Sequence, residues 1–376
     1  MEKPIRILHV LQRMEAGGTQ ALLMNLYRNI DRNKVQFDFL VEYPNKQFYD
    51  DEILAMGGRI YYTNIRNDKN LLKFKHKLKE IICDNHYKII HVHTYSIGYF
   101  VLKCAQKYGI PVRIAHSHSN CMTHDYKMFL KLVLKKLYPV YATNYMACSK
   151  EAGEFLFYGK KYMILNNSID AKKFIFSEKI RENVRKKLNL DDKFVVGHVG
   201  RFRPEKNHLF LLDIFYEIKK KKSNAQLLLI GNEDSNKEIR NKISQLNLSN
   251  NLIILNNRTD INELYQAMDV FIFPSLYEGL GIAAIEAQAS GIPCVCADTL
   301  PEESNISRLF MCLSLNEKPS VWAEKAIEHS KSNMKFRNMY NDVCNNNYDI
   351  LKNAKVIEKY YCDLYENEVI NEKSIG

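Results

Sequence analysis

Short apolar runs alternate with amphipathic stretches along the whole chain. In the first half, the apolar runs predict strands at residues 5–11, 35–41, 60–63, 89–93, 112–116 and 144–147. In the second half, they predict strands at 194–200, 226–231, 252–255, 270–273 and 309–313, and another that begins near Cys294. Helical periodicity appears between the strands, near 69–85, 97–108, 209–219, 282–289, 319–331, 335–347 and 356–365. Strands that alternate with helices predict α/β domains with doubly wound parallel sheets.

Residues 165–174 form a polar, turn-rich stretch between the two strand–helix series. A chain of 376 residues is long enough for two domains that each bury a core. We therefore expect domains at 1–168 and 169–351, followed by a last helix and a frayed end at 368–376. Ligands of such sheets bind beyond the carboxyl ends of the strands.

The composition argues against a membrane-spanning or secreted protein. The chain has no apolar run of about 18 residues, and its first eleven residues have the pattern of a strand rather than of a signal peptide. Nine cysteines occur without a Cys-x-x-Cys pair, which favours reduced thiols and no zinc site built on them. We expect a cytoplasmic protein.

The net charge of +11 falls almost entirely on the first half, where residues 1–170 hold 25 Lys and Arg against 15 Asp and Glu. No helix-turn-helix, RNP-like or zinc-finger pattern accompanies this charge, so nucleic acid is not the expected partner. An anionic membrane surface or a pyrophosphate-bearing acceptor explains it better.

Two helices of the first half are rich in lysine. In residues 126–138, Lys127, Lys131 and Lys135 share one face against a wide apolar remainder. This pattern fits a helix that lies on an anionic membrane, and equally a sheet-covering helix with a solvated lysine stripe. For the second helix, at Lys69–Lys79, we favour the sheet-covering interpretation.

The stretch 270–294 carries the most specific chemistry. Its strand is followed by a loop with Gly279 and Gly281 and then by a compact helix of small residues. The backbone amides of Leu280, Gly281 and Ile282 would therefore point at whatever lies above the sheet, and anions prefer such a position.

Two glutamates flank this anion position. Glu278 lies in the loop, and Glu286 lies roughly 7.5 Å further along the helix axis than Gly281, too far for one acid/base pair. The offset suits a nucleotide sugar, which has a hexose at one end and a ribose diol at the other. The simpler alternatives are a turn residue at Glu278 and a solvated helix position at Glu286.

Other strand ends carry cations, glycines and histidines. Arg201 and Lys206 follow the strand at 194–200 and are suited to neutralising a diphosphate, although such residues are often plain surface cations. Gly17 and Gly18 follow the first strand without forming Gly-x-Gly-x-x-Gly, so a nicotinamide site has weak support.

Four histidines lie near one rim of the first sheet, at His91, His93, His116 and His118. A single histidine at a strand end is more often structural than catalytic, and four together favour a functional role. No carboxylate cluster accompanies them, so a metal site is the weaker choice and no metal is expected.

The spacing Glu278-x7-Glu286 inside Pro-Ser-x-x-Glu-Gly-x-Gly resembles the retaining GT-B glycosyltransferases of glycosyltransferase family 4, of the bacterial exopolysaccharide and capsule type. The resemblance covers nearly the whole chain and is strongest at 195–297. It implies two Rossmann-like doubly wound domains facing a central cleft, the first binding the acceptor and the second the nucleotide sugar. It also implies that the final helix, about 352–367, returns to the first domain.

The resemblance also assigns roles to residues. Through the motif Gly-Arg-x4-Lys, Arg201 and Lys206 correspond to the cations that hold the sugar donor's diphosphate. Glu278 corresponds to the residue that positions the sugar. A histidine beside the sugar corresponds to His118 in preference to His116. The implied donor-binding set is completed by Gly17, Gly18, Arg258 at the nucleobase, Gly279, Leu280, Gly281, Ile282 and Glu286. The family linker matches 165–174 except at Asn166 and Ser168, which puts the local turn type in doubt.

No two aspartates are spaced by one residue, so the metal-binding Asp-x-Asp of many transferases is missing. We expect metal-independent transfer, with charge stabilised by Arg201, Lys206 and the helix amides. The resemblance implies retention by front-face attack, a donor that is most often a UDP-sugar, and a saccharide or lipid-linked acceptor in cell-surface polysaccharide synthesis.

Three alternatives stay open at this point. A GT-B sugar-nucleotide 2-epimerase would need acid/base carboxylates facing C2 of the sugar. A non-catalytic nucleotide-sugar-binding subunit would not need the intact set of Glu278, Glu286, Arg201 and Lys206. A phosphorylase that uses pyridoxal phosphate has little support, because no lysine stands in a recognisable cofactor site.

Overall fold

The computed structural model describes residues 3–15, 17–94, 97–118, 128–231, 237–256, 258–332, 336 and 338–375. The chain divides into two compact units. Unit 1 comprises Met1–Ile169 and Asp349–Gly376, and unit 2 comprises Asp170–Tyr348. The first of these divisions lies one residue from the boundary expected at 168/169.

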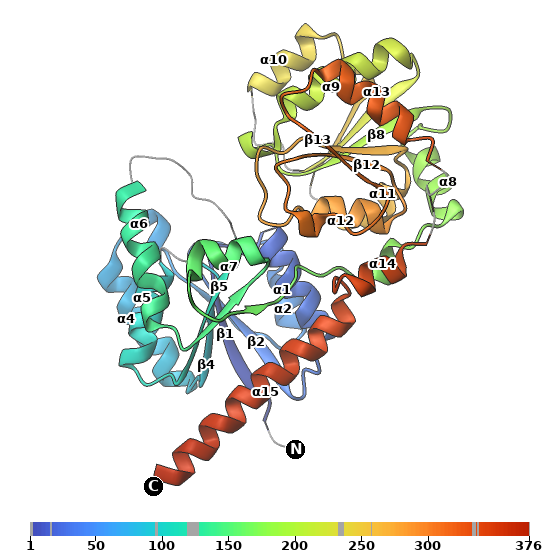
Figure 1. The fold of residues 1–376 in the computed structure, drawn as a ribbon. Helices are drawn as coiled ribbons and strands as arrows, with labels where there is room; N and C mark the ends of the chain where they lie inside the picture. The colour runs from blue at the N-terminus through green and yellow to red at the C-terminus, as the bar shows by residue number, and fades with distance from the viewer. Residues whose placement is uncertain are drawn as a thin grey trace. The chain divides into compact units, whose positions relative to one another are not determined.

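Unit 1 is built on a seven-stranded parallel sheet with the order β3-β2-β1-β4-β5-β6-β7 (Figure 1). The strands are β1 (Ile5–Leu11), β2 (Val35–Val41), β3 (Ile60–Tyr62), β4 (Ile89–Val92), β5 (Val112–Ser117), β6 (Asn144–Ala147) and β7 (Met163–Ile164). The helices are α1 (Gly18–Asn29), α2 (Asp50–Ala55), α3 (Ile65–Asp68), α4 (Leu71–Asn85), α5 (Gly98–Lys107), α6 (Met128–Leu137), α7 (Lys150–Phe157) and α15 (Ile350–Ile375).

Helices cover both faces of this sheet, because alternate residues of its strands are buried on opposite sides. Ile7 and Leu11 of β1 pack in one core with α1 and α15, and Leu8 and Val10 pack in the other with α4 and α5. The lysine-rich helix α4 is thus a sheet-covering helix, as expected. The strand order reverses between β1 and β4, which places the expected ligand edge at their carboxyl ends.

The last helix of the chain belongs to unit 1. Ile350, Ala354, Ile357 and Tyr361 of α15 recur at helical spacing and are buried in the same core as α1. The helix continues to Ile375, so the prediction of a frayed end from 368 was wrong. No Gly or Pro occurs from Ile350 to Ile375, so no helix-ending residue interrupts this helix.

Unit 2 has a six-stranded parallel sheet with the order β10-β9-β8-β11-β12-β13. The strands are β8 (Phe194–Val199), β9 (Ala225–Ile230), β10 (Leu252–Leu255), β11 (Val270–Phe273), β12 (Cys294–Ala297) and β13 (Phe310–Leu313). The helices are α8 (Glu178–Lys187), α9 (His208–Lys221), α10 (Lys237–Gln245), α11 (Ile261–Gln266), α12 (Ile282–Ala289), α13 (Pro319–His329) and α14 (Tyr340–Asn345). The expected helix 335–347 is therefore shorter at both ends in the described part of this region.

Helix α8 was not predicted, because its sequence is almost entirely polar. Two of its arginines are nonetheless buried: Arg181 donates to Asp269 at 2.8 Å, and Arg185 contacts the same carboxylate at 3.3 Å. Asp269 precedes β11 and also accepts a hydrogen bond from the backbone amide of Val195 in β8. This charged cluster attaches α8 to the two central strands of unit 2.

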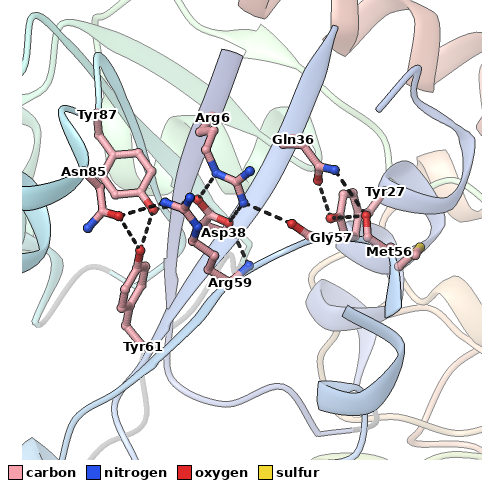
Figure 2. Close-up of polar contacts among 10 residues, drawn as sticks. All are labelled: Arg6, Tyr27, Gln36, Asp38, Met56, Gly57, Arg59, Tyr61, Asn85 and Tyr87. Carbon is pink, nitrogen blue, oxygen red and sulfur yellow. Dashed lines mark hydrogen bonds and ion pairs between the residues drawn. The ribbon is translucent and has the colours of Figure 1, made fainter. Parts of the chain in front are cut away.

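A second buried carboxylate organises the amino-terminal half of the unit 1 sheet. Asp38 on β2 accepts hydrogen bonds from Arg6 Nε at 2.7 Å, from the Tyr87 hydroxyl at 2.6 Å and from the backbone amide of Arg59 at 2.7 Å (Figure 2). Tyr87 in turn lies 3.1 Å from the Tyr61 hydroxyl. Asp38 therefore connects groups from β1, β2, the β3 region and the segment before β4.

We predict that Asp38→Asn destabilises the protein by about 3 kcal/mol, or about 6 to 12 °C in Tm, because it removes the buried partner of Arg6. Circular dichroism melts of the full chain measure the change. The matched control is Asp51→Asn, whose carboxylate pairs with Lys46 but is 78% exposed, and it should shift Tm little. Equal melting temperatures for the two variants would contradict the assignment.

Candidate functional site

The strand order of unit 2 reverses between β8 and β11, and the loops that leave these two strands meet. The backbone amide of Leu276, after β11, donates to the carbonyl of Glu205, after β8, at 2.8 Å. Beside this contact, Lys206 Nζ lies 2.5 Å from Glu278 Oε1, with both side chains more than four-fifths buried. The structure thus brings together two residues that the sequence analysis placed at one rim from separate motifs.

Lys206 also has an aromatic neighbour, since its ammonium lies 4.7 Å from the ring centroid of Phe273 at the end of β11. An ammonium group that is mostly withdrawn from water, above an aromatic face, interacts strongly with any anion brought to it. In the structure that anion is the carboxylate of Glu278.

Arg201 follows β8 directly and is exposed at the same end of the strand. Its loop is held closely against the loop after β9: a Cβ on Gly231 would lie 2.0 Å from the carbonyl oxygen of Gly200. Only glycine permits this backbone approach. Asn232, the next residue, lies outside the described residues.

Helix α12 begins immediately after the glutamate loop. Gly281 precedes it with φ of +76°, in the left-handed region, and a Cβ there would lie only 3.3 Å from Ser304 Oγ. The backbone therefore requires glycine at this position. Within the described part of the chain, the amides of Leu280, Gly281 and Ile282 donate no hydrogen bond. They are available to an anion at the helix N-terminus.

Glu286, on the second turn of α12, is partly buried and accepts a hydrogen bond from the Tyr265 hydroxyl at 3.0 Å. Burial raises the pKa of Glu286 to about 7, and the Tyr265 hydrogen bond opposes part of that rise. Sequence reasoning missed Tyr265, because nothing in the pattern of α11 distinguishes it from a core aromatic residue.

Arg258 follows the edge strand β10, with β9 between that strand and β8. Its guanidinium forms a bidentate ion pair with Asp260, in which Nε donates to Oδ1 at 2.7 Å. A nucleobase contact by Arg258 would therefore have to compete with Asp260.

The four histidines predicted to lie near one rim of unit 1 are gathered at the carboxyl ends of β4 and β5. His91 Nε2 lies 3.0 Å from His116 Nδ1, and His93 Nδ1 lies 2.8 Å from His118 Nε2. A fifth histidine, His9 on β1, joins them with Nδ1 3.0 Å from His93 Nε2. The sequence analysis missed His9 because it occupies a core position within an apolar strand.

Burial is the main cause of the lowered pKa values of these five histidines. It lowers the pKa values of His9 and His118 to about 3, and it lowers those of His91, His93 and His116 well below the usual value, with further lowering from neighbouring imidazoles. All five rings are therefore neutral near pH 7. His116 and His118 are suited to hydrogen bonding rather than to carrying charge.

Gly17 and Gly18 lie where β1 passes into α1. Gly17 is extended and Gly18 is the first residue of the helix, and a Cβ added to Gly18 would meet no atom within 4 Å. Neither backbone conformation nor packing in the structure requires glycine at position 18.

The comparisons with known proteins agree with the two-unit architecture. Residues 180–337 match the domain family described as "Glycosyl transferases group 1", and residues 16–172 match the one described as "Glycosyltransferase Family 4". The chain is 38% identical over 331 residues to "Putative glycosyltransferase EpsF" of Bacillus subtilis, covering 85% of this chain and 86% of that protein. The chain belongs to the glycosyltransferases.

Other relatives of this glycosyltransferase match over almost their full lengths. One is the UDP-Gal:alpha-D-GlcNAc-diphosphoundecaprenol alpha-1,3-galactosyltransferase of Escherichia coli, 23% identical with 97% of this chain and 98% of that protein covered. Another is the capsular polysaccharide biosynthesis glycosyltransferase CapH of Staphylococcus aureus, 25% identical with 95% and 98% covered.

Among solved structures, Anabaena HepE in complex with UDP and glucose superposes with a TM-score of 0.79 at 18% identity, over 95% of this chain and 99% of that one. At this identity the likeness concerns the fold alone. The expected fold class, two Rossmann-like parallel-sheet domains of the GT-B type, is confirmed.

We predict that Glu286→Gln stabilises this glycosyltransferase at pH 8 by about 1–3 kcal/mol and has little effect at pH 5. The raised pKa of Glu286 means that folding takes up a proton between about pH 4.5 and 7, so stability from this group is lost as pH rises through 7. Thermal melts at both pH values measure the effect.

The control for this comparison is Glu324→Gln, at a carboxylate of unit 2 that is 69% exposed. Its effect on Tm should be the same at pH 5 and pH 8. If Glu286→Gln also changes Tm by the same amount at pH 5 and pH 8, the buried carboxylate is not the source of the pH dependence.

Proposed function

We propose that this glycosyltransferase transfers a hexose-type sugar from a UDP-sugar to a saccharide or lipid-linked saccharide, with retention and without a metal ion. The observation that carries the proposal is the Lys206–Glu278 ion pair at the end of β11, next to the free amides that begin α12. A cation, a carboxylate and a helix N-terminus at the switch point of a parallel sheet suit a diphosphate joined to a sugar.

In the absence of ligand, Lys206 and Glu278 neutralise each other. The diphosphate of the sugar donor would replace Glu278 as the partner of Lys206, and Arg201 and the amides of Leu280, Gly281 and Ile282 would add further positive charge. Glu278 would then be free to accept hydrogen bonds from the hydroxyl groups of the sugar. Nucleotide binding and sugar positioning are thus coupled through one ion pair.

The chemical step requires stabilisation of the negative charge that grows on the leaving diphosphate. Arg201 and Lys206 are fixed positive charges, and the α12 amides are aligned dipoles, so no metal is needed for this purpose. We propose front-face attack, in which the departing phosphate oxygen accepts the proton of the acceptor hydroxyl. His118, in preference to His116, would supply a neutral hydrogen-bonding group beside the sugar.

At the nucleoside end, Glu286 would accept hydrogen bonds from the ribose diol while Tyr265 fixes its orientation at 3.0 Å. A buried Glu286 that is kept ionised destabilises the fold, and such a loss of stability is common in binding sites. We assign the nucleobase contact to Arg258, after release from Asp260, and Gly279 to the loop that borders the phosphates.

Uridine is the proposed base because the E. coli relative is named for a UDP-galactose donor and the HepE structure contains UDP. The same relative is named for a diphosphoundecaprenol-linked acceptor, and the S. aureus relative for capsular polysaccharide biosynthesis. We propose by this analogy a role in cell-surface polysaccharide synthesis.

We also propose that unit 1 contacts an anionic membrane from the cytoplasmic side. No helix in the described part of the chain is long and apolar enough to cross a bilayer. Helix α6 and the turn after it nevertheless expose five apolar side chains, at Phe129, Leu132, Val133, Leu137 and Val140, a set we call the α6 apolar face. Exposed apolar patches of this kind mark interaction sites.

The expected lysine stripe of this helix is only partly described. Lys127 lies outside the described residues, and so does the side chain of Lys131. Lys135 lies 3.6 Å from the ring centroid of Phe155, and burial lowers its pKa, so it is turned toward the protein rather than fully solvated. The proposal of membrane contact therefore rests on the α6 apolar face together with the basic charge of residues 1–170.

For the sugar-donor site, we predict that UDP at about 100 times its Kd stabilises the protein by about 2.7 kcal/mol in a thermal-shift assay, while GDP and ADP at the same concentration stabilise it less. Lys206→Ala should abolish the UDP shift, because the diphosphate loses its buried cation. The control Lys220→Ala removes an exposed lysine of unit 2 and should keep the shift.

The Glu278→Gln variant separates binding from transfer. It frees Lys206 from its ion pair, so UDP should bind at least as tightly as to the unchanged protein, while release of UDP from UDP-hexoses in the presence of acceptor should fall by about 100-fold or more. If no nucleotide shifts the melt, or if Lys206→Ala retains the full shift, the proposed site is wrong.

For membrane contact, we predict that the chain co-floats with vesicles of phosphatidylglycerol and that the double variant Phe129→Ser/Leu132→Ser reduces the bound fraction several-fold. The control Leu72→Ser removes an equally exposed apolar side chain, 80% exposed on α4, and should not change flotation. Absence of the unchanged protein from the floated fraction would end the membrane proposal.

A further inference from the structure

Five imidazoles line one face of the unit 1 sheet. His9 of β1 is in register with His91 of β4, and stacked or tilted rings continue from them to His93, His116 and His118 with centroid separations of 4.0 to 5.3 Å. The parallel register of β1, β4 and β5 creates this array, because residues two apart on a strand point to the same side. No carboxylate hydrogen-bonds to any of the five within the described residues.

Among the described residues, not every nitrogen of this array has a hydrogen-bond partner. His9, His93 and His118 form a chain of two imidazole–imidazole bonds, and its outer atoms, His9 Nε2 and His118 Nδ1, are buried without a partner in the described structure. A neutral imidazole carries one N–H, so whichever way the chain is polarised, one end presents an N–H with no acceptor. A buried unmatched polar group costs about 1–3 kcal/mol.

The second chain has the same defect. Tyr361 of α15 lies 2.7 Å from His91 Nδ1, and His91 Nε2 bonds His116 Nδ1. His116 Nε2 is buried and has no partner in the described part of the chain, which brings the unmatched nitrogens of the array to three among the described residues. A buried hydrogen-bond network is normally complete, so an incomplete one leaves room for a further partner, such as a water molecule or an ion.

The ligand geometry is that of a cation site. One nitrogen each from His9, His91 and His93 lie within 4.8 Å of one another, and so do one each from His93, His116 and His118. Three imidazoles with a fourth open position suit Zn²⁺ and its neighbours Co²⁺, Ni²⁺ and Cu²⁺, whereas Mg²⁺, Ca²⁺ and Mn²⁺ prefer oxygen ligands.

We propose that the five-histidine array of unit 1 binds one divalent transition-metal ion of the zinc class. His93 belongs to both triads, and a neutral imidazole has one lone pair for a metal, so a single ion occupies one triad at a time. An ion held by His9, His91 and His93 leaves His118 for the sugar contact proposed above. This replaces, for unit 1 only, the expectation that the histidines hold no metal. The ion has no part in neutralising the sugar donor's diphosphate, which we assign to Arg201 and Lys206.

The test uses the full-length chain without an affinity tag, stripped with a chelator, exchanged into metal-free buffer and titrated with Co²⁺. We expect saturable d–d absorption of a nitrogen-ligated Co²⁺ ion at one equivalent per chain, displaced by Zn²⁺ and unaffected by excess Mg²⁺. His93→Gln should abolish the band because both triads lose a ligand.

The matched control is His208→Gln in unit 2. His208 is also buried against another histidine, His198, at 4.9 Å between ring centroids, but neither belongs to a triad in the described part of the chain. This variant should bind Co²⁺ as the unchanged protein does. Cys83 and Cys312 are exposed thiols in every variant, so binding to them would persist in His93→Gln and appear as sulfur-to-cobalt charge transfer.

A second variant covers the outcome in which His93→Gln does not fold. The double variant His9→Gln/His116→Gln breaks both triads and leaves His93 in place. Loss of the band from a folded double variant supports the proposal. The proposal is overturned if the unchanged protein shows no saturable band, or if the band survives in a folded variant that lacks both triads.

Discussion

The ion pair between Lys206 and Glu278 is the interaction on which the account of this glycosyltransferase depends. Its two residues are 72 positions apart, and the parallel pairing of β8 with β11 brings their loops together. A lysine withdrawn from water needs an anion, and the carboxylate of Glu278 supplies one. In the function that we propose, a diphosphate takes the place of this carboxylate. The pair therefore keeps a cation ready at the sheet edge without leaving it uncompensated.

The backbone around this ion pair requires glycine at two positions. Glycine is required at Gly281 by its left-handed conformation and at Gly231 by the carbonyl of Gly200, which lies against it. These two positions hold the loops that surround Lys206 and start α12. The charges at the strand ends are therefore carried by loops whose backbone paths fit only glycine at these two positions.

Much of this arrangement could be predicted from the sequence. Strands buried on both faces read as continuous apolar runs, and the spacing from Glu278 to Glu286 fixes a loop followed by a helix. What could not be predicted depends on partners distant in sequence. The sequence of helix α8 is too polar to predict a buried helix, and its packing depends on the ion pairs of Arg181 and Arg185 with Asp269. Tyr265 could not be identified because its hydrogen bond to Glu286 comes from another helix.

His9 could not be predicted for the same reason. Its place in an apolar strand indicates a core residue, and only the fold shows that it forms the end of a hydrogen-bonded chain of histidines. Unit 1 thus contains a nitrogen-rich array suited to a transition-metal ion, whereas unit 2 contains the fixed cations suited to a diphosphate. In our two proposals these features make different demands on solution conditions, because only the histidine array binds a metal ion.

The central claim is that Arg201, Lys206 and the α12 amides stabilise the leaving diphosphate in place of a divalent cation. The most direct measurement is the rate of UDP release from a UDP-hexose, with acceptor present, before and after treatment with excess chelator. The account predicts an unchanged rate that Mg²⁺ and Mn²⁺ do not increase. A rate that falls to background and is restored by either of these ions would contradict it.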